Sequence, residues 1–176
     1  MISRALFVEN KKLRILDFDD TLVKTKSLVY VIHKNGKKSK MTPGQYAMYE
    51  PKEGDEFDYS DFKSVKNPEE IKPMTSVLKR IIKSNKRNLT YILTARSAYR
   101  PIVKYLKTIG IDTNKLYVIA LDSSDSKAKS DWIEKMIETK KFDDVYFADD
   151  SEKNVKAVKR MLRTKNVKSR VRLIKY

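Results

Sequence analysis

From Pro73 onward, short apolar runs alternate with stretches whose apolar residues recur at helical spacing. Such runs are typical of buried strands, and the stretches between them are typical of amphipathic helices. With one earlier run, the predicted strands cover residues 13–18, 89–93, 116–121, 145–148 and 171–174. This alternation predicts an α/β fold, a Rossmann-like sheet of about five mainly parallel strands flanked by helices.

Residues 23–72 interrupt this pattern. They hold three of the four glycines, and a β-branched and aromatic run at 28–33 is followed by Asn35-Gly36, a hairpin-turn signal. A connection this long in a compact domain is usually functional. We therefore expect one domain, 1–176, with a small cap at 23–72 inserted after the first strand. The cap's aromatic residues form either its own small core or a platform for stacking bases.

Charge and cysteine content narrow the function classes. The net charge is +16, and residues 73–176 hold 25 basic and 11 acidic side chains. This excess favours a polyanionic partner such as nucleic acid, although a lysine-rich solubilising surface would give the same excess. The absence of cysteine excludes disulfides, a thiolate nucleophile and a Cys-ligated zinc site.

No segment resembles a targeting or membrane-spanning sequence. Residues 1–10 lack a basic region followed by a long apolar one, and no stretch approaches about 18 uncharged apolar residues. We expect a soluble, cytoplasmic protein with no membrane partner. The sequence leaves the oligomeric state open.

Three carboxylates, Asp17, Asp19 and Asp20, crowd the end of the first predicted strand. Neighbouring carboxylates repel each other unless a cation, hydrogen bonds or a retained proton offsets the cost. Mg²⁺ is a natural partner because it takes oxygen ligands from carboxylates, water and phosphate. The alternative is an exposed acidic turn.

Other polar groups follow the later strands. Thr94 and Arg96 follow the second strand, and Asp149-Asp150 follows the fourth. Two lysines precede the helix between the third and fourth strands. In open parallel sheets, ligands bind beyond the carboxyl ends of the strands. The fold therefore predicts that these groups gather at one edge.

This order of motifs, D-x-D-x-T, then Thr, then Lys before a helix, then DD, resembles the haloacid dehalogenase (HAD) superfamily of phosphotransferases. The resemblance covers nearly the whole chain. It implies a Mg²⁺-dependent phosphomonoester hydrolase that works through an aspartyl-phosphate. Asp17 would be the nucleophile and Asp19 the general acid and base. The implied metal ligands are Asp17, Phe18 through its backbone carbonyl, Asp19, Asp149 and Asp150. Asp150 would bind the metal through water or would instead brace Lys129.

The resemblance also implies roles for the remaining polar residues. Thr94 would hold a phosphoryl oxygen, and Lys129 would neutralise charge on the transferring group. Lys127 is the rival for this position; we prefer Lys129 because it stands one turn before the sole tryptophan. Thr21, Arg96 and Lys127 are expected to bind substrate, with a salt bridge to the cap as the alternative for Arg96.

Two features depart from the common pattern. Asp20 stands where many members of the superfamily carry glycine, and its role stays open. His33, the only histidine, is expected to be an ordinary residue of the hairpin, so phosphohistidine chemistry and a histidine-rich metal site are poorly supported.

The substrate is less constrained than the reaction. The basic C-terminal half, the Thr-Ala-Arg turn and the small cap resemble the phosphatase modules of phage-type polynucleotide kinase/phosphatases, which remove 3′-phosphates from nucleic-acid ends. No kinase P-loop motif occurs. The alternatives are a phosphatase of mononucleotides or other small metabolites, a non-catalytic nucleic-acid-binding module, and a structural protein that uses the acid cluster only for a cation.

Overall fold

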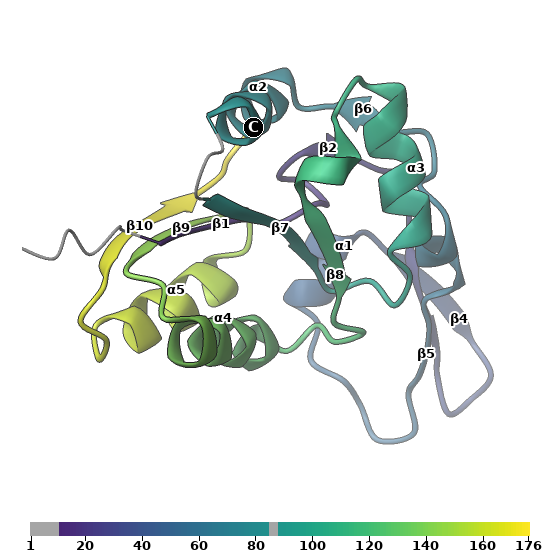
Figure 1. Ribbon diagram of the computed structural model, residues 1–176. Coiled ribbons are helices and arrows are strands. Elements are labelled where there is room, and N and C mark those ends of the chain that lie inside the picture. Colours follow the sequence, from purple (N-terminus) through teal and green to yellow (C-terminus); the bar gives the residue numbers. More distant parts are fainter. Residues whose placement is uncertain (1–10, 85–87) are drawn as a thin grey trace, which may run out of the picture.

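The computed structural model describes residues 11–84 and 88–176 (Figure 1). Its centre is a five-stranded sheet in the order β10-β9-β1-β7-β8, with every neighbouring pair parallel. The strands are β1 Lys12–Leu16, β7 Asn88–Thr94, β8 Tyr117–Ala120, β9 Asp144–Asp149 and β10 Lys168–Leu173. The predicted fold class is therefore confirmed. The prediction about residues 1–10 concerns a segment outside the described residues.

Helices cover both faces of this sheet (Figure 1). They are α2 Lys72–Lys83 and α3 Arg100–Thr108 on one face, and α4 Ser126–Lys140 and α5 Glu152–Leu162 on the other. Successive residues of β1 point to opposite faces of the sheet. Ile15 packs in the core formed with α4 and α5, and Leu16 packs in the core formed with α2 and α3. A strand buried on both faces reads as an almost continuous apolar run, which explains the strand signal near residue 13. Within the described ranges, no helix has the length and apolarity needed to cross a membrane.

The edge strand β10 begins at Lys168, earlier than the predicted start at residue 171. Lys168, Ser169 and Arg170 are exposed, and the strand pairs with β9 on one side. The pairing with β9, and not an apolar composition, fixes this part of the strand. A search for apolar runs therefore finds only its carboxyl half.

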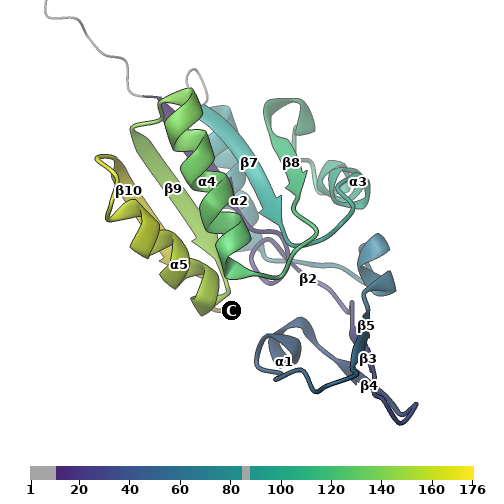
Figure 2. The same cartoon turned by 90° about the horizontal axis from the view of Figure 1, so that it is seen from below.

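Between β1 and α2, the chain forms two small antiparallel sheets, and we call residues 23–72 the cap segment. One sheet pairs β2 with β6, and the other has the order β4-β3-β5. The elements are β2 Val23–Lys24, β3 Val29–Ile32, β4 Lys38–Met41, α1 Pro43–Ala47, β5 Glu56–Asp58, the 3₁₀ turn η1 Ser60–Lys63 and β6 Glu69–Glu70. A second 3₁₀ turn, η2 Thr113–Lys115, precedes β8 outside this segment. Figure 2 shows the cap segment beyond the ends to which the arrows of β7 and β9 point.

The cap segment has its own aromatic cluster. The rings of Tyr46, Tyr49, Phe57 and Tyr59 lie 5.4–6.3 Å apart, mostly edge to face. Such contacts stabilise small cores. The aromatic residues thus pack on one another, which is one of the two interpretations that the sequence left open. The Tyr59 side chain stays partly exposed. Stacking of a base on this ring, the other interpretation, stays a prediction.

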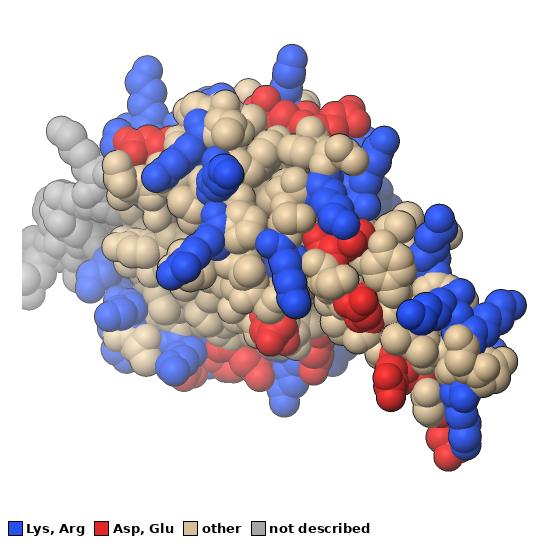
Figure 3. All heavy atoms as spheres, turned by 90° about the vertical axis from the view of Figure 1, so that its right-hand side faces the viewer, with Lys and Arg blue, Asp and Glu red and all other residues tan. Residues whose placement is uncertain are grey.

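Charged side chains are dispersed over the face that carries α3 and β8. Figure 3 shows lysine and arginine side chains standing apart on the main body, with uncharged surface between them. Acidic side chains lie among them and at the junction with the protruding cap segment. The main body therefore presents no continuous basic area on this face.

Candidate active site

Three carboxylates meet at the carboxyl ends of β1 and β9. Asp17 follows β1 directly, Asp149 closes β9, and Asp150 comes next. One carboxylate oxygen of each residue lies within 4.8 Å of the other two. The Asp17 N–H donates to the Ala148 carbonyl at 2.9 Å and so holds the end of β1 against β9. This oxygen-rich cluster could hold a metal ion, and its ligand type suits Mg²⁺.

Lys129, in the first turn of α4, is the cation of this cluster. Its Nζ lies 2.6 Å from Asp17 Oδ1 and 2.7 Å from Asp149 Oδ2, and the side chain is buried. Asp125 caps α4 by accepting the N–H of Lys127, whose side chain is exposed. The structure thus brings Lys129, and not Lys127, to the carboxylates.

Burial and mutual repulsion shift the pKa values of these groups. Burial raises the pKa of Asp17 well above its usual range, although Lys129 opposes this effect. Burial, with repulsion from Asp149 and Asp20, raises the pKa of Asp150 to about 7. Burial alone would lower the pKa of Lys129, but Asp17 and Asp149 raise it above its ordinary value. The site holds more negative charge than one lysine neutralises, so a divalent cation would relieve the remaining repulsion.

Asp19 is bound by Arg96 instead of by Lys129. The Nε and one Nη of Arg96 donate to the two Asp19 carboxylate oxygens at 2.8 and 2.7 Å. The other Nη donates to the carbonyls of Phe62 and Ser64 in the cap segment, at 3.1 and 2.6 Å. The guanidinium also lies over the rings of Phe18 and Phe62. Arg96 therefore joins Asp19 to the cap segment; its grip on phosphate stays a prediction.

This ion pair bears on the predicted acid–base role of Asp19. Both Asp19 oxygens accept hydrogen bonds from Arg96, and the Thr25 hydroxyl adds a third at 3.2 Å. Oδ1 thus accepts two hydrogen bonds and Oδ2 one, so the second lone pair of Oδ2 is the position left for a proton. The acid–base role of Asp19 stays a prediction.

The two predicted threonines lie at the same edge of the sheet. Thr94 closes β7, and its hydroxyl accepts the Arg96 N–H at 3.2 Å but donates to no group among the described residues. Its proton is thus available for another acceptor. The Thr21 hydroxyl donates to Asp150 Oδ1 at 3.4 Å. Both side chains are buried.

The backbone carbonyls after Asp17 differ in their partners. The Phe18 carbonyl accepts the N–H groups of Leu22 and Val23 at 2.9 and 3.2 Å. Over the described ranges, no N–H donates to the Asp19 carbonyl. Of the two carbonyls, that of Asp19 is the one left for a cation, and the predicted ligation by Phe18 would compete with two backbone hydrogen bonds.

Asp149 has supporting partners that the motifs did not include. Asn154 Nδ2 donates to both Asp149 oxygens at 3.1 Å, and the Ser151 N–H donates to Oδ1 at 2.8 Å. The Ser151 side chain also caps α5. A serine three residues before Asn154 at a helix start is a capping signal, and it could have located both residues.

Asp20 occupies a left-handed backbone conformation, with φ 52°. Its N–H donates to the Val23 carbonyl at 2.8 Å and closes the turn. Asp tolerates this conformation better than most residues, and glycine adopts it freely. The conformation gives a physical reason for glycine at this position in many HAD members. Burial, with Asp19 nearby, raises the pKa of Asp20.

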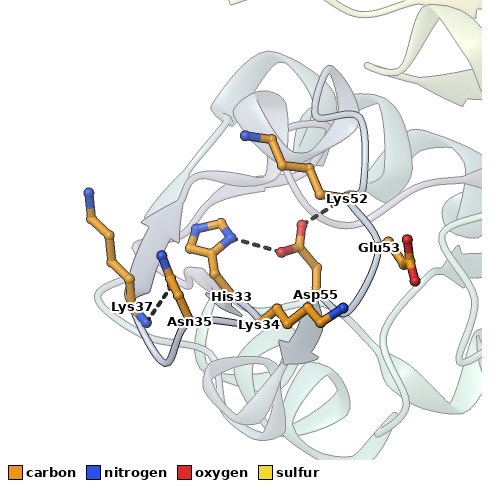
Figure 4. Close-up of a pocket in the computed structure, with 7 residues that line it drawn as sticks. All are labelled: His33, Lys34, Asn35, Lys37, Lys52, Glu53 and Asp55. Atoms are coloured by element: carbon orange, nitrogen blue, oxygen red, sulfur yellow. Dashed lines mark hydrogen bonds and ion pairs between the residues drawn. The ribbon is translucent and has the colours of Figure 1, made fainter.

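His33 belongs to a separate polar group in the cap segment (Figure 4). Its Nδ1 lies 2.8 Å from Asp55 Oδ1 and its Nε2 lies 2.9 Å from Ser39 Oγ. Hydrogen bonds from the Tyr49 hydroxyl and the Lys52 N–H lower the pKa of Asp55 to about 2. The group cross-links β4, the turn after β3 and the segment before β5, as expected of a structural histidine.

Comparisons with known proteins bear on the fold alone. No protein-family model and no curated protein matches this sequence. Among solved structures, the HAD domain of the effector protein Lem4 from Legionella pneumophila superposes with a TM-score of 0.57. The match covers 94% of this chain and 86% of that one, at 13% sequence identity. The chain has the fold of a HAD domain.

The HAD fold was the main expectation from the four motifs, and it is confirmed. The acidic cluster lies at the edge where ligands of parallel sheets bind. At 13% sequence identity, the comparison assigns no role to an individual residue. The roles of the named side chains and the likeness to 3′-phosphatase modules stay predictions.

Proposed function

We propose that this protein is a Mg²⁺-dependent phosphomonoesterase that acts on the phosphorylated 3′ ends of nucleic acids. The observation that carries the proposal is Lys129 between Asp17 and Asp149, beside a carboxylate cluster of metal-binding spacing. A buried lysine of this kind can neutralise charge on a phosphoryl group that arrives next to Asp17. The HAD fold supports the reaction class.

The reaction would proceed in two steps. An Asp17 carboxylate oxygen attacks phosphorus, the P–O bond to the substrate breaks, and the leaving oxygen takes a proton from Asp19. A water molecule then loses its proton to Asp19 and attacks the aspartyl-phosphate, which releases inorganic phosphate and restores Asp17. Thr94 is placed to donate its free proton to a phosphoryl oxygen. The chemistry expected from Mg²⁺ held by Asp17, Asp149 and Asp150 is neutralisation of the carboxylate and phosphate charges.

The test is phosphate release with and without Mg²⁺. We expect hydrolysis of phosphomonoesters that EDTA abolishes, and Asp17→Asn should lower kcat by at least about 10³-fold because the nucleophile is lost. Asp131→Asn, an exposed acid on α4, is the matched control. After an acid quench, the intact mass of the protein should show one added phosphoryl group. Peptide mapping should place this group on the peptide that contains Asp17. Full activity of Asp17→Asn would overturn the nucleophile assignment.

Substrate choice is tested separately. A 3′-phosphorylated oligonucleotide should be hydrolysed with a higher kcat/KM than its 5′-phosphorylated counterpart, mononucleotides or sugar phosphates. The reverse order would assign the protein to small-metabolite phosphatases. Nucleic-acid binding without any turnover would instead indicate a non-catalytic module.

A further inference from the structure

Basic side chains concentrate in the last part of the chain. Residues 152–176 hold ten of the 39 basic residues and one of the 23 acidic ones, a net charge of +9 in 25 residues. Four of the chain's ten arginines lie here, although lysine is almost three times commoner overall. A general preference for lysine does not account for this enrichment. Arginine is the residue whose planar fork matches phosphate.

These residues form α5 and β10, which lie next to each other at one edge of the molecule (Figures 1 and 2). Six of them are exposed and, within the part of the chain that the structure describes, form no ion pair. We call these six the α5–β10 basic surface: Lys159, Arg160, Arg163, Lys168, Arg170 and Arg172. Their charge is thus available to a partner.

Along β10, the basic residues alternate with apolar ones. Val171 and Leu173 pack against the core with α4 and α5. Because side chains alternate along a strand, Lys168, Arg170 and Arg172 share the opposite face, with a repeat of about 6.6 Å. The edge strand therefore carries a regular row of three cations.

On the other side of β10 lies a recess of about 230 Å³. Lys159 on α5 and Arg163, the C-cap residue of that helix, line it together with Ser169 from β10. Basic groups thus flank both faces of the edge. Edge strands often carry a charge that blocks pairing with other chains. That purpose would explain the three cations of β10, but not Lys159 and Arg163.

The row leads to the acidic cluster. β10 runs parallel to β9, Leu173 is the register partner of Asp149, and the Ile174 N–H donates to the Asp149 carbonyl at 2.9 Å. The end of β10 therefore reaches the site. Figure 2 shows the C terminus at these strand ends.

We infer that the α5–β10 basic surface binds the phosphodiester backbone of a nucleic-acid strand, whose end then enters the site of Asp17. The second half of this inference rests on the proposed function. β10 spans about 20 Å, the length of roughly six nucleotides at the duplex rise of about 3.4 Å, and of fewer in an extended single strand. The surface therefore has room for a short strand.

The first experiment measures binding alone. A fluorescent single-stranded 12-mer with a 3′-hydroxyl is titrated with the full-length protein, so that nothing can be hydrolysed. The test variant combines Arg163→Gln, Arg170→Gln and Arg172→Gln. We expect the Kd to rise about tenfold or more at 0.1 M salt, and the slope of log K against log salt to fall by about 2, because three phosphate contacts are lost.

The matched control removes the same charge elsewhere, with Lys104→Gln, Lys107→Gln and Lys135→Gln on α3 and α4. These side chains are exposed, and the control should change the Kd less than about threefold. Equal weakening by both triple variants would show that only net charge matters and would overturn the inference. Tighter binding of a polyglutamate peptide than of the 12-mer would assign the surface to an acidic protein.

The second experiment separates this inference from the proposed function. With 4-nitrophenyl phosphate, which is too small to reach the surface, the test variant should keep the parent kcat/KM; this also verifies folding. With the 3′-phosphorylated 12-mer, kcat/KM should fall by the same factor as the affinity. A protein that binds the 12-mer but hydrolyses neither substrate would refute the proposed function and keep the surface. Hydrolysis of both substrates at the parent rate by the test variant would refute the role of the α5–β10 basic surface and would support the proposed function.

Discussion

Lys129 and Arg96 are both buried cations that bind an aspartate of the D-x-D-x-T motif, but they belong to different parts of the molecule. Lys129 contacts Asp17 and Asp149, which follow neighbouring strands of one sheet. Arg96 contacts Asp19 and two carbonyls of the cap segment. The first cluster contains no residue of the cap segment, whereas the second includes two of its carbonyls. Asp17, the proposed nucleophile, thus lies at the edge of the central sheet, and Asp19, the proposed acid, lies where the sheet meets the cap segment.

The largest effect is expected from Lys129→Met. The variant should lose about 10³-fold in kcat, because nothing else among the described residues places a cation on both carboxylates. Removing one partner of a buried ion pair also lowers stability, by about 3–5 kcal/mol. Mg²⁺ should then raise the melting temperature more in the variant than in the parent. Thermal melts with and without Mg²⁺, next to a phosphate-release assay, measure both effects.

The control for this variant is Lys135→Met, on an exposed face of the same helix. It should leave the melting temperature and the response to Mg²⁺ as in the parent. If Lys129→Met retained activity, the cation between the carboxylates would be structural and the site would need another phosphate ligand.

Arg96→Lys tests the boundary and should have the next largest effect. Lysine keeps the charge but cannot hold the Asp19 oxygens and two cap carbonyls at once. We expect kcat to fall by about 10²-fold, the order of a general acid's contribution. The cap segment should also become more sensitive to limited proteolysis. Arg100→Lys, exposed at the start of α3, is the control. If Arg96→Lys lost activity while the cap segment stayed protected from proteolysis, the bonds of Arg96 to the cap would not be what activity depends on.

The difference between the two clusters also explains what the sequence could predict. Asp17, Asp149 and Lys129 each follow a strand or start a helix of the regular part of the chain, so the fold alone brings them together. The partners of Arg96 are backbone carbonyls at Phe62 and Ser64, in a segment without periodicity. A bond from Arg96 to the cap was one of two expectations, but a carbonyl has no residue type, so no sequence motif could have marked these two partners.

The start of β10 escaped prediction for a related reason. Its first residues are charged and held by pairing with β9, so their composition carries no strand signal. Asn154 lies outside the four motifs, and its amide binds both oxygens of Asp149. Its role depends on the exact start of α5, which sequence periodicity does not fix.

Asn154→Ala tests this support and should have an intermediate effect. Groups that orient a metal-ligating carboxylate typically contribute about 10–100-fold to metal affinity or activity. We expect the Mg²⁺ concentration for half-maximal activity to rise by about tenfold, with a smaller change in kcat at saturating Mg²⁺. Asn166→Ala, exposed after α5, is the control. A lower kcat at every Mg²⁺ concentration, with unchanged Mg²⁺ dependence, would show that Asn154 acts on something other than the metal site.

The smallest effect is expected from Asp55, whose partners all lie within the cap segment. Its pKa is lowered to about 2, chiefly by the Tyr49 hydroxyl, so the ionised carboxylate stabilises the folded cap above the ordinary carboxyl pKa near 4. That stabilisation is lost as the pH falls towards 2. Asp55→Asn should therefore lower the melting temperature at pH 7 but not at pH 2, whereas Glu53→Gln, at the same recess, should lower it at neither pH. A pH-independent difference between parent and Asp55→Asn would mean that packing, and not the charge of Asp55, stabilises the cap.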